Sequence, residues 1–167
     1  MATQGTWQST ESYVVPQAIG ETSTVQLNPL GLVIQARDIK SLTQYGNATF
    51  IYLKGVSSTI VGSVVTYDNN SQTALIVGDA VGPVAVAMSI NVAGPNYGWY
   101  QRSGIAYMAS ETTVVADELL FIGATAGKVD DAVVAGDAIL TATSLTAASG
   151  GFLDGYMNFP AVTDVIA

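Results

Sequence analysis

The chain carries short apolar runs separated by polar breaks, without a sustained helical period. From Gly31 onward, clusters of Gly, Asn, Asp and Ser separate runs rich in β-branched and aromatic residues, at residues 32–36, 48–56, 58–67 and 74–78. Turn signals spaced about ten residues apart favour antiparallel strands, because βαβ units need longer helical segments between their strands. We therefore expect an all-β fold, a small barrel or sandwich of short antiparallel strands.

The first thirty residues have a different pattern. Residues 1–30 are rich in Thr, Ser, Gln and Gly, and their large side chains stand alone. We interpret them as an extended N-terminal arm preceding a β domain at residues 31–167. Isolated apolar side chains can anchor an arm in the grooves of a neighbouring subunit, and the candidates for such contacts are Trp7, Tyr13, Leu27, Pro29 and Leu30. The alternatives are a flexible tail or an edge strand on the chain's own domain.

Two segments of the chain resemble each other at an offset of 55 residues. This offset aligns Tyr52 with Tyr107 and Val64 with Leu119. In both segments, a Tyr-containing strand runs into a Ser- and Thr-rich turn and then into a second apolar strand. The pattern predicts two related β units, at about residues 45–80 and 100–135, which pack together and bury what neither can bury alone. Chance similarity between Val- and Ala-rich segments is the alternative.

Composition indicates a surface with few charges. Charged residues make up 11% of the chain, apolar residues 49%, and the mean hydropathy is +0.39. Ordinary soluble domains have about 25% charged residues. Such a surface suits burial in an assembly, although a monomer covered with Ser, Thr, Asn and Gln is also compatible. The net charge is −8 and the five cations form no run along the sequence, so nucleic acid is not an expected partner.

The absent residue types exclude most familiar catalytic machinery. The chain has no histidine and no cysteine, which excludes Ser-His-Asp and Cys-His sites and the usual zinc sites. A carboxylate pair or a calcium site at Asp130 and Asp131 remain as alternatives, but acidic residues in Gly- and Ser-bearing turns more often cap those turns. We expect no enzyme activity, no catalytic residues, no cofactor and no metal.

The N-terminal sequence lacks the basic and apolar regions of a secretory signal. Residues 81–93, the longest apolar-leaning stretch, contain Gly82, Pro83, Ser89 and Asn91 and are too short to span a bilayer. We therefore expect synthesis in the cytoplasm and no membrane partner.

One aromatic segment suggests a second kind of function. Tyr97, Trp99 and Tyr100 stand close together in the sequence after a Pro-Asn turn signal. Exposed Trp and Tyr rings can stack on sugars, so a carbohydrate-binding module is one interpretation. A turn followed by a core strand is the other, and strand alternation then predicts that one of Trp99 and Tyr100 is buried while the other lies at an edge.

Residues 84–160 resemble a known family, the capsid decoration or cement proteins of bacteriophages. The resemblance consists of an Ala- and Val-rich strand followed, in order, by Tyr97-Gly98-Trp99-Tyr100-Gln101, Ser103-Gly104-Ile105-Ala106, the run from Ala124 to Ala132, and Asn158-Phe159-Pro160. Residues before about 45 lie outside it.

The resemblance implies a non-catalytic virion protein that is made in the host cytoplasm. It would sit on the outer surface of a phage head and clamp adjacent major capsid subunits, with the major capsid protein and further copies of itself as partners, the latter favoured as a homotrimer. A head-fibre or tail-associated β protein is the alternative within the virion.

Overall fold

The chain folds entirely into strands and connecting turns over the part that the structure describes. The computed structural model describes residues 6–10, 15–39, 45–91 and 96–163. Its strands are β1 (Trp7–Ser9), β2 (Thr22–Ser23), β3 (Val33–Asp38), β4 (Asn47–Lys54), β5 (Val64–Tyr67), β6 (Thr73–Leu75), β7 (Gly82–Ala87), β8 (Tyr97–Ala109), β9 (Leu119–Ile122), β10 (Val129–Asp130), β11 (Ala138–Ser144) and β12 (Phe152–Val162).

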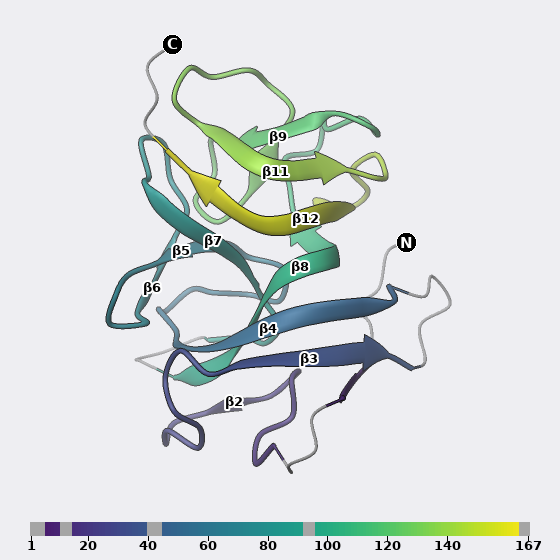
Figure 1. The fold of residues 1–167 in the computed structure, drawn as a ribbon. Helices are drawn as coiled ribbons and strands as arrows, with labels where there is room; N and C mark the ends of the chain where they lie inside the picture. The colour runs from purple at the N-terminus through teal and green to yellow at the C-terminus, as the bar shows by residue number, and fades with distance from the viewer. Residues whose placement is uncertain (1–5, 11–14, 40–44, 92–95, 164–167) are drawn as a thin grey trace.

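The strands form one hydrogen-bonded network in which every named strand pair is antiparallel. The main path runs β1-β3-β4-β8-β7-β12-β11-β9-β10, with β2 on β8, and with β5 joining β6 to β7. Its two ends, β1 and β10, do not meet, so the sheet is not closed. The sheet curls into two stacked halves, with β3 and β4 in the lower half and β9, β11 and β12 in the upper half (Figure 1). The expected all-β fold is confirmed.

Three buried clusters lie between the layers. The lower cluster contains Trp99 and lies between the N-terminal segment and the layer of β3, β4 and the first part of β8. The middle cluster contains Ile51 and Val65, and the upper cluster contains Val64 and Leu153. Val64 and Val65 are neighbours on β5 and point to different clusters, as strand alternation requires. The layer that contains β5 and β7 is therefore buried on both faces.

The long strand β8 joins the two halves. Its first part pairs with β4 and its second part pairs with β12. The register with β4 shifts between Thr49 and Phe50, which leaves Arg102 as an extra, bulged residue on β8. Gly104 follows with a φ of 90°, and a Cβ there would lie 2.8 Å from the backbone oxygen of Asn47. Glycine at this position lets β4 and β8 approach closely while β8 turns toward β12.

The pairings in the two halves repeat at the offset seen in the sequence. Tyr52 faces Trp99 across β4 and β8, and the residues 55 positions further on, Tyr107 and Asp154, face each other across β8 and β12. Val64 faces Val86 in the same way that Leu119 faces Thr143. Here the first partner advances by 55 residues and the second by 57, because the intervening segments differ in length. The β4–β8 unit and the β8–β12 unit thus share β8 and one pairing scheme.

The two halves differ at the edge that β3 covers. In the lower half, the backbone of Tyr52 donates to Leu32 O and accepts from Gly31 N, each at 2.9 Å. No strand lies along the corresponding edge of β8 among the described residues. Instead, the Gln101 side-chain amide donates to the backbone oxygens of Ser103 and Ile105, at 3.0 and 2.8 Å. A side chain therefore occupies an edge that would otherwise present unpaired carbonyls.

Candidate interaction surface

Trp7, the first of the predicted arm residues, packs on the chain's own sheet. It lies in β1, which pairs with β3. Its ring meets the Phe50 ring edge-on at a centroid distance of 5.0 Å and stacks on Tyr45 at 6.2 Å. The side chain is half-buried against the lower cluster. Trp7 is therefore engaged within its own domain, which agrees with the edge-strand alternative.

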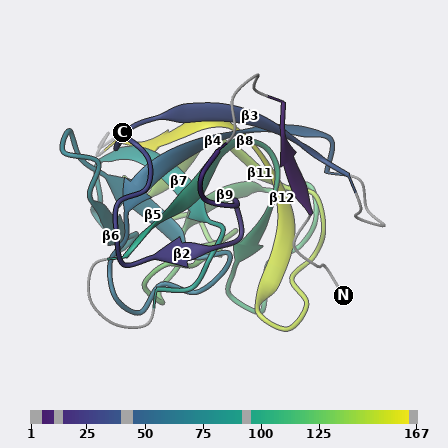
Figure 2. The same cartoon turned by 90° about the horizontal axis from the view of Figure 1, so that it is seen from below.

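Gln17 ties the N-terminal segment to the sheet, and the sequence pattern did not single it out. Its side-chain amide donates to the backbone oxygens of Glu21 and Tyr97, and its side-chain oxygen accepts from the Tyr52 hydroxyl at 2.6 Å. Its backbone oxygen accepts from Trp99 Nε1 at 3.0 Å. Gln17 is 2% exposed. A buried Gln between polar segments has no periodicity signal, so only the fold reveals this role. Figure 2 looks from below onto β2 and the neighbouring N-terminal chain.

The remaining predicted arm residues fall into three classes. Leu30 is half-buried and packs against the lower cluster. Leu27 and Pro29 are exposed, although the Leu27 N–H donates to the Tyr52 hydroxyl at 3.2 Å. Tyr13 lies outside the described residues. The five residues therefore do not form one continuous gripping surface, and Leu27 and Pro29 are the described members that face solvent.

The aromatic segment of β8 is part of the core. Trp99 is fully buried in the lower cluster and Tyr100 is 4% exposed in the middle cluster. The expectation that one of the two lies at an edge was wrong, because β8 is covered on both faces at this point. Burial raises the pKa of the Tyr100 hydroxyl to about 12. Neither ring offers a face to a sugar, and only Tyr97 is partly exposed.

Several carboxylates that were candidates for chemistry cap turns. Asp68 Oδ1 accepts from the backbone N–H groups of Asn70 and Gln72, both at 2.9 Å, and these bonds lower the pKa of Asp68. Glu111 accepts from Thr125 N, which likewise lowers its pKa. Asp131 Oδ2 accepts from a backbone N–H at 2.9 Å. These bonds stabilise the ionised carboxylates in the turns.

Two searches of the described residues gave no site of another kind. No group of three or more acidic residues is placed to hold a metal ion in this part of the chain. Within the same residues, no helix is long and apolar enough to cross a membrane.

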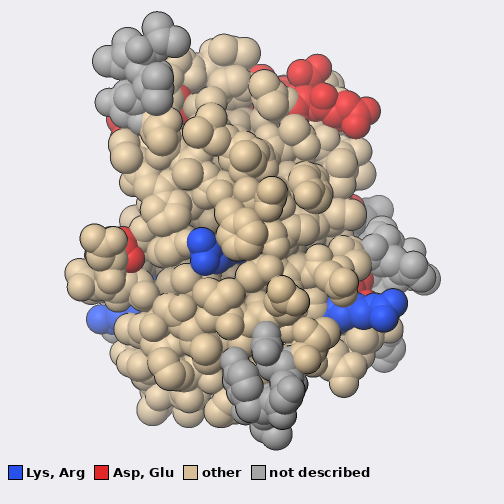
Figure 3. Space-filling model, viewed as in Figure 1, with Lys and Arg blue, Asp and Glu red and all other residues tan. Residues whose placement is uncertain are grey.

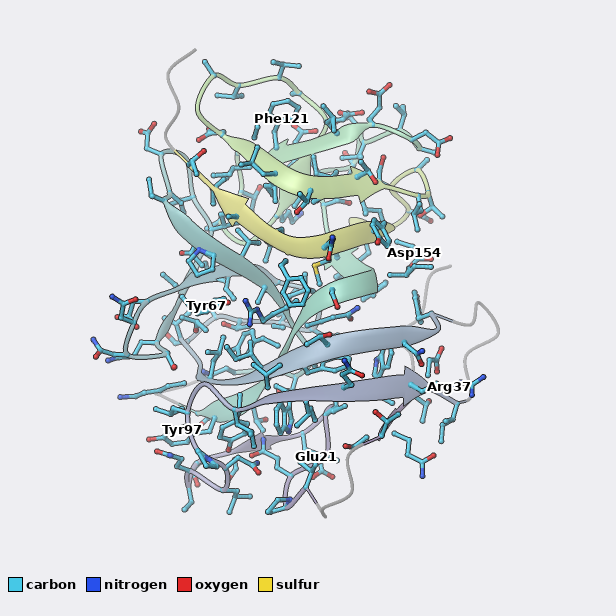
Figure 4. The ribbon with its side chains drawn as sticks, viewed as in Figure 1. Glu21, Arg37, Tyr67, Tyr97, Phe121 and Asp154 are labelled. Carbon is cyan, nitrogen blue, oxygen red and sulfur yellow. The ribbon has the colours of Figure 1, made fainter. Side chains whose placement is uncertain are left out.

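An arginine held between two aromatic rings marks the surface where the halves meet. The Arg102 guanidinium carbon lies 5.1 Å from the centroid of the Phe159 ring and 5.8 Å from that of Tyr67. Burial raises the pKa of Tyr67, and the positive charge of Arg102 acts in the opposite direction. Tyr67 lies at mid-height in Figure 4, between β7 and β4. We call Tyr67, Arg102 and Phe159 the Arg102 site.

The backbone beside the Arg102 site adopts unusual conformations. Phe159 on β12 has a φ of 49°, and Thr141 on the neighbouring strand β11 has a φ of 63°. Positive φ is rare for bulky and β-branched residues. The Thr141 hydroxyl donates to Asn158 O at 2.7 Å, and the β11–β12 register shifts at this point. These bulges turn the Phe159 ring outward, where it is 51% exposed.

The surface around this site is apolar and sparsely charged. Leu140 and Tyr156, from the same two strands as Thr141 and Phe159, are each 48% exposed. The face in Figure 3 is almost entirely uncharged, with isolated basic and acidic groups. Sequence reasoning anticipated the low charge but not the site, because its three members are distant in the chain. No protein-family model matches the chain, and no curated protein matches it.

Proposed function

We propose that this chain is a structural protein of a bacteriophage virion, a capsid decoration or cement protein. It binds the outside of the head and clamps adjacent major capsid subunits. The observation that carries the proposal is the combination of large exposed apolar side chains with only 11% charged residues. Uncharged surface is less costly to desolvate than charged surface, so it suits permanent burial at subunit contacts.

The resemblance of residues 84–160 to decoration proteins supports the same proposal. In the proposed arrangement the protein associates with itself, as a homotrimer, and several copies attach to one shell. Linked contacts retain a ligand more strongly than single ones, by factors of roughly 10² to 10⁴. The acidic residues, which are concentrated after Arg102, would keep decorated particles apart.

The first test is quantitative mass spectrometry of purified virions, combined with electron cryomicroscopy of the particles. A decoration protein is present in a copy number comparable with that of the major capsid protein and forms density on the outer surface. A low copy number would indicate the head-fibre or tail-associated alternative. Absence from the virion would refute both. Light scattering of the free protein tests the proposed trimer.

A second test uses expanded empty shells and the purified protein. We expect saturable binding that is displaced by unlabelled protein and that raises the temperature at which the shells break. Binding without stabilisation would contradict the clamping role, and no binding would contradict attachment to the head.

A further inference from the structure

We propose that the Arg102 site binds the carboxylate of an Asp or Glu side chain on a partner protein. This inference rests on the proposed role as an interaction protein and specifies where one polar contact forms. The site is built from β5, β8 and β12, so it exists only where the two halves of the fold meet.

The first step in the argument is that Arg102 lacks an anionic partner within the chain. Arg102 forms no hydrogen bond or ion pair among the described residues, and its Nε is buried without an acceptor. A guanidinium group has five N–H donors and stays charged at any accessible pH. Leaving a buried donor of a charged group unpaired is costly. An acceptor supplied from outside would remove that cost.

The second step is that the two rings hold the guanidinium in place. Tyr67 and Phe159 lie within the distance at which cation–π attraction operates, about 6 Å from the ring centroid. Contacts through the flat faces leave the edges of the guanidinium plane available for hydrogen bonds. Less conformational freedom is then lost when a bond forms at those edges. The site therefore resembles a prepared half of a bidentate ion pair.

The third step concerns the chemistry of the occupant. A planar carboxylate matches the fork of N–H groups on a guanidinium. Phe159 and Tyr156, two of the exposed apolar residues nearby in the chain, lie on the same strand. A carboxylate within an otherwise uncharged partner surface fits this setting, because a strongly acidic partner would be repelled by the net charge of −8.

The site itself can be tested without any partner protein. The probe is acetate, added in exchange for chloride at constant ionic strength, and the readout is the NMR signal of the Arg102 Nε–H group. We expect a saturable shift at Arg102, whereas the exposed Arg37 should show only a small linear change. Replacing Phe159→Leu keeps the charge but removes one ring, and should weaken acetate binding several-fold. Equal responses at Arg102 and Arg37 would overturn the inference.

Binding to expanded empty shells tests whether the site is used. Arg102→Gln should weaken binding at least tenfold, since a charge-assisted hydrogen bond contributes about 1.5 to 3 kcal/mol. Arg102→Lys should recover only part of this loss because it lacks the planar fork, and Arg37→Gln should bind as the wild type does. Circular dichroism and urea unfolding would establish that the variants fold.

The two proposals fail in different ways. If the wild type does not bind shells, the proposed function is wrong, while the acetate titration still decides whether Arg102 takes a carboxylate. If the wild type binds and Arg102→Gln binds equally well, the function stands and the inference about Arg102 is wrong.

Discussion

The Tyr45 hydroxyl donates a 2.7 Å hydrogen bond to Asp154 Oδ1, across 109 residues of sequence. Tyr45 lies just before β4, in the lower half, and Asp154 lies on β12, in the upper half, at the right-hand end of that strand in Figure 4. Both side chains are buried. This bond is a polar link between halves that are otherwise joined mainly through strand pairing and apolar packing.

Replacing Tyr45→Phe should destabilise the protein, because it leaves a buried carboxylate oxygen without this donor. We expect the free energy of unfolding, measured with urea, to fall by about 1 to 3 kcal/mol. Tyr156→Phe is the matched control, since that side chain is 48% exposed and should change the free energy by less than about 0.5 kcal/mol. Equal losses in the two variants would show that the bond to Asp154 contributes little.

The N-terminal segment should contribute to folding stability through Gln17. Gln17→Ala removes three side-chain hydrogen bonds and should lower the free energy of unfolding by about 2 to 4 kcal/mol, because buried partners are left unpaired. Gln8→Ala, at an exposed position of β1, is the control. Deleting residues 1–30 should expose the lower cluster and lower the unfolding midpoint further. A deletion variant as stable as the full chain would restore the interpretation of a dispensable arm.

Stability should fall in strong alkali because Tyr100 resists ionisation in the folded protein. Its pKa is raised to about 12 from 10.0, mainly by burial. The unfolded chain therefore ionises first, so this contribution is fully present below pH 10 and is lost as the pH rises toward 12. Urea unfolding at a series of pH values should show a shallower decline in Tyr100→Phe. Tyr67 and Tyr107 act in the same direction, so some decline should remain. A slope identical to that of the wild type would contradict the assignment.

The equivalent turns of the two units offer a matched pair of substitutions. Gly62 and Asp117, 55 residues apart, have φ values of 87° and 64°. Gly62→Ala should destabilise by more than about 1 kcal/mol, since a Cβ would lie 3.2 Å from Tyr107 O and the backbone disfavours it. Asp117→Gly should be neutral or stabilising by up to about 1 kcal/mol for the same conformational reason. Thermal unfolding of both variants tests this, and a stabilised Gly62→Ala would contradict the equivalence.

The sequence by itself determined the class of fold and its local punctuation. Alternating β-branched runs and polar breaks predicted an all-β protein, and the turn at Asp68 appears where its side chain can cap the following N–H groups. The 55-residue offset recurs in the pairings of Tyr52 and Tyr107. These features depend on neighbouring residues, whose preferences are written directly in the chain.

Tertiary structure alone decided which faces are covered and which distant residues meet. Strand alternation assigns Trp99 and Tyr100 to opposite faces, but only the layers on either side of β8 bury both. The docking of Gln17 and the meeting of Arg102 with two rings depend likewise on long-range pairing. The period of a strand identifies residues that share a face, whereas coverage of that face depends on contacts between segments far apart in the chain.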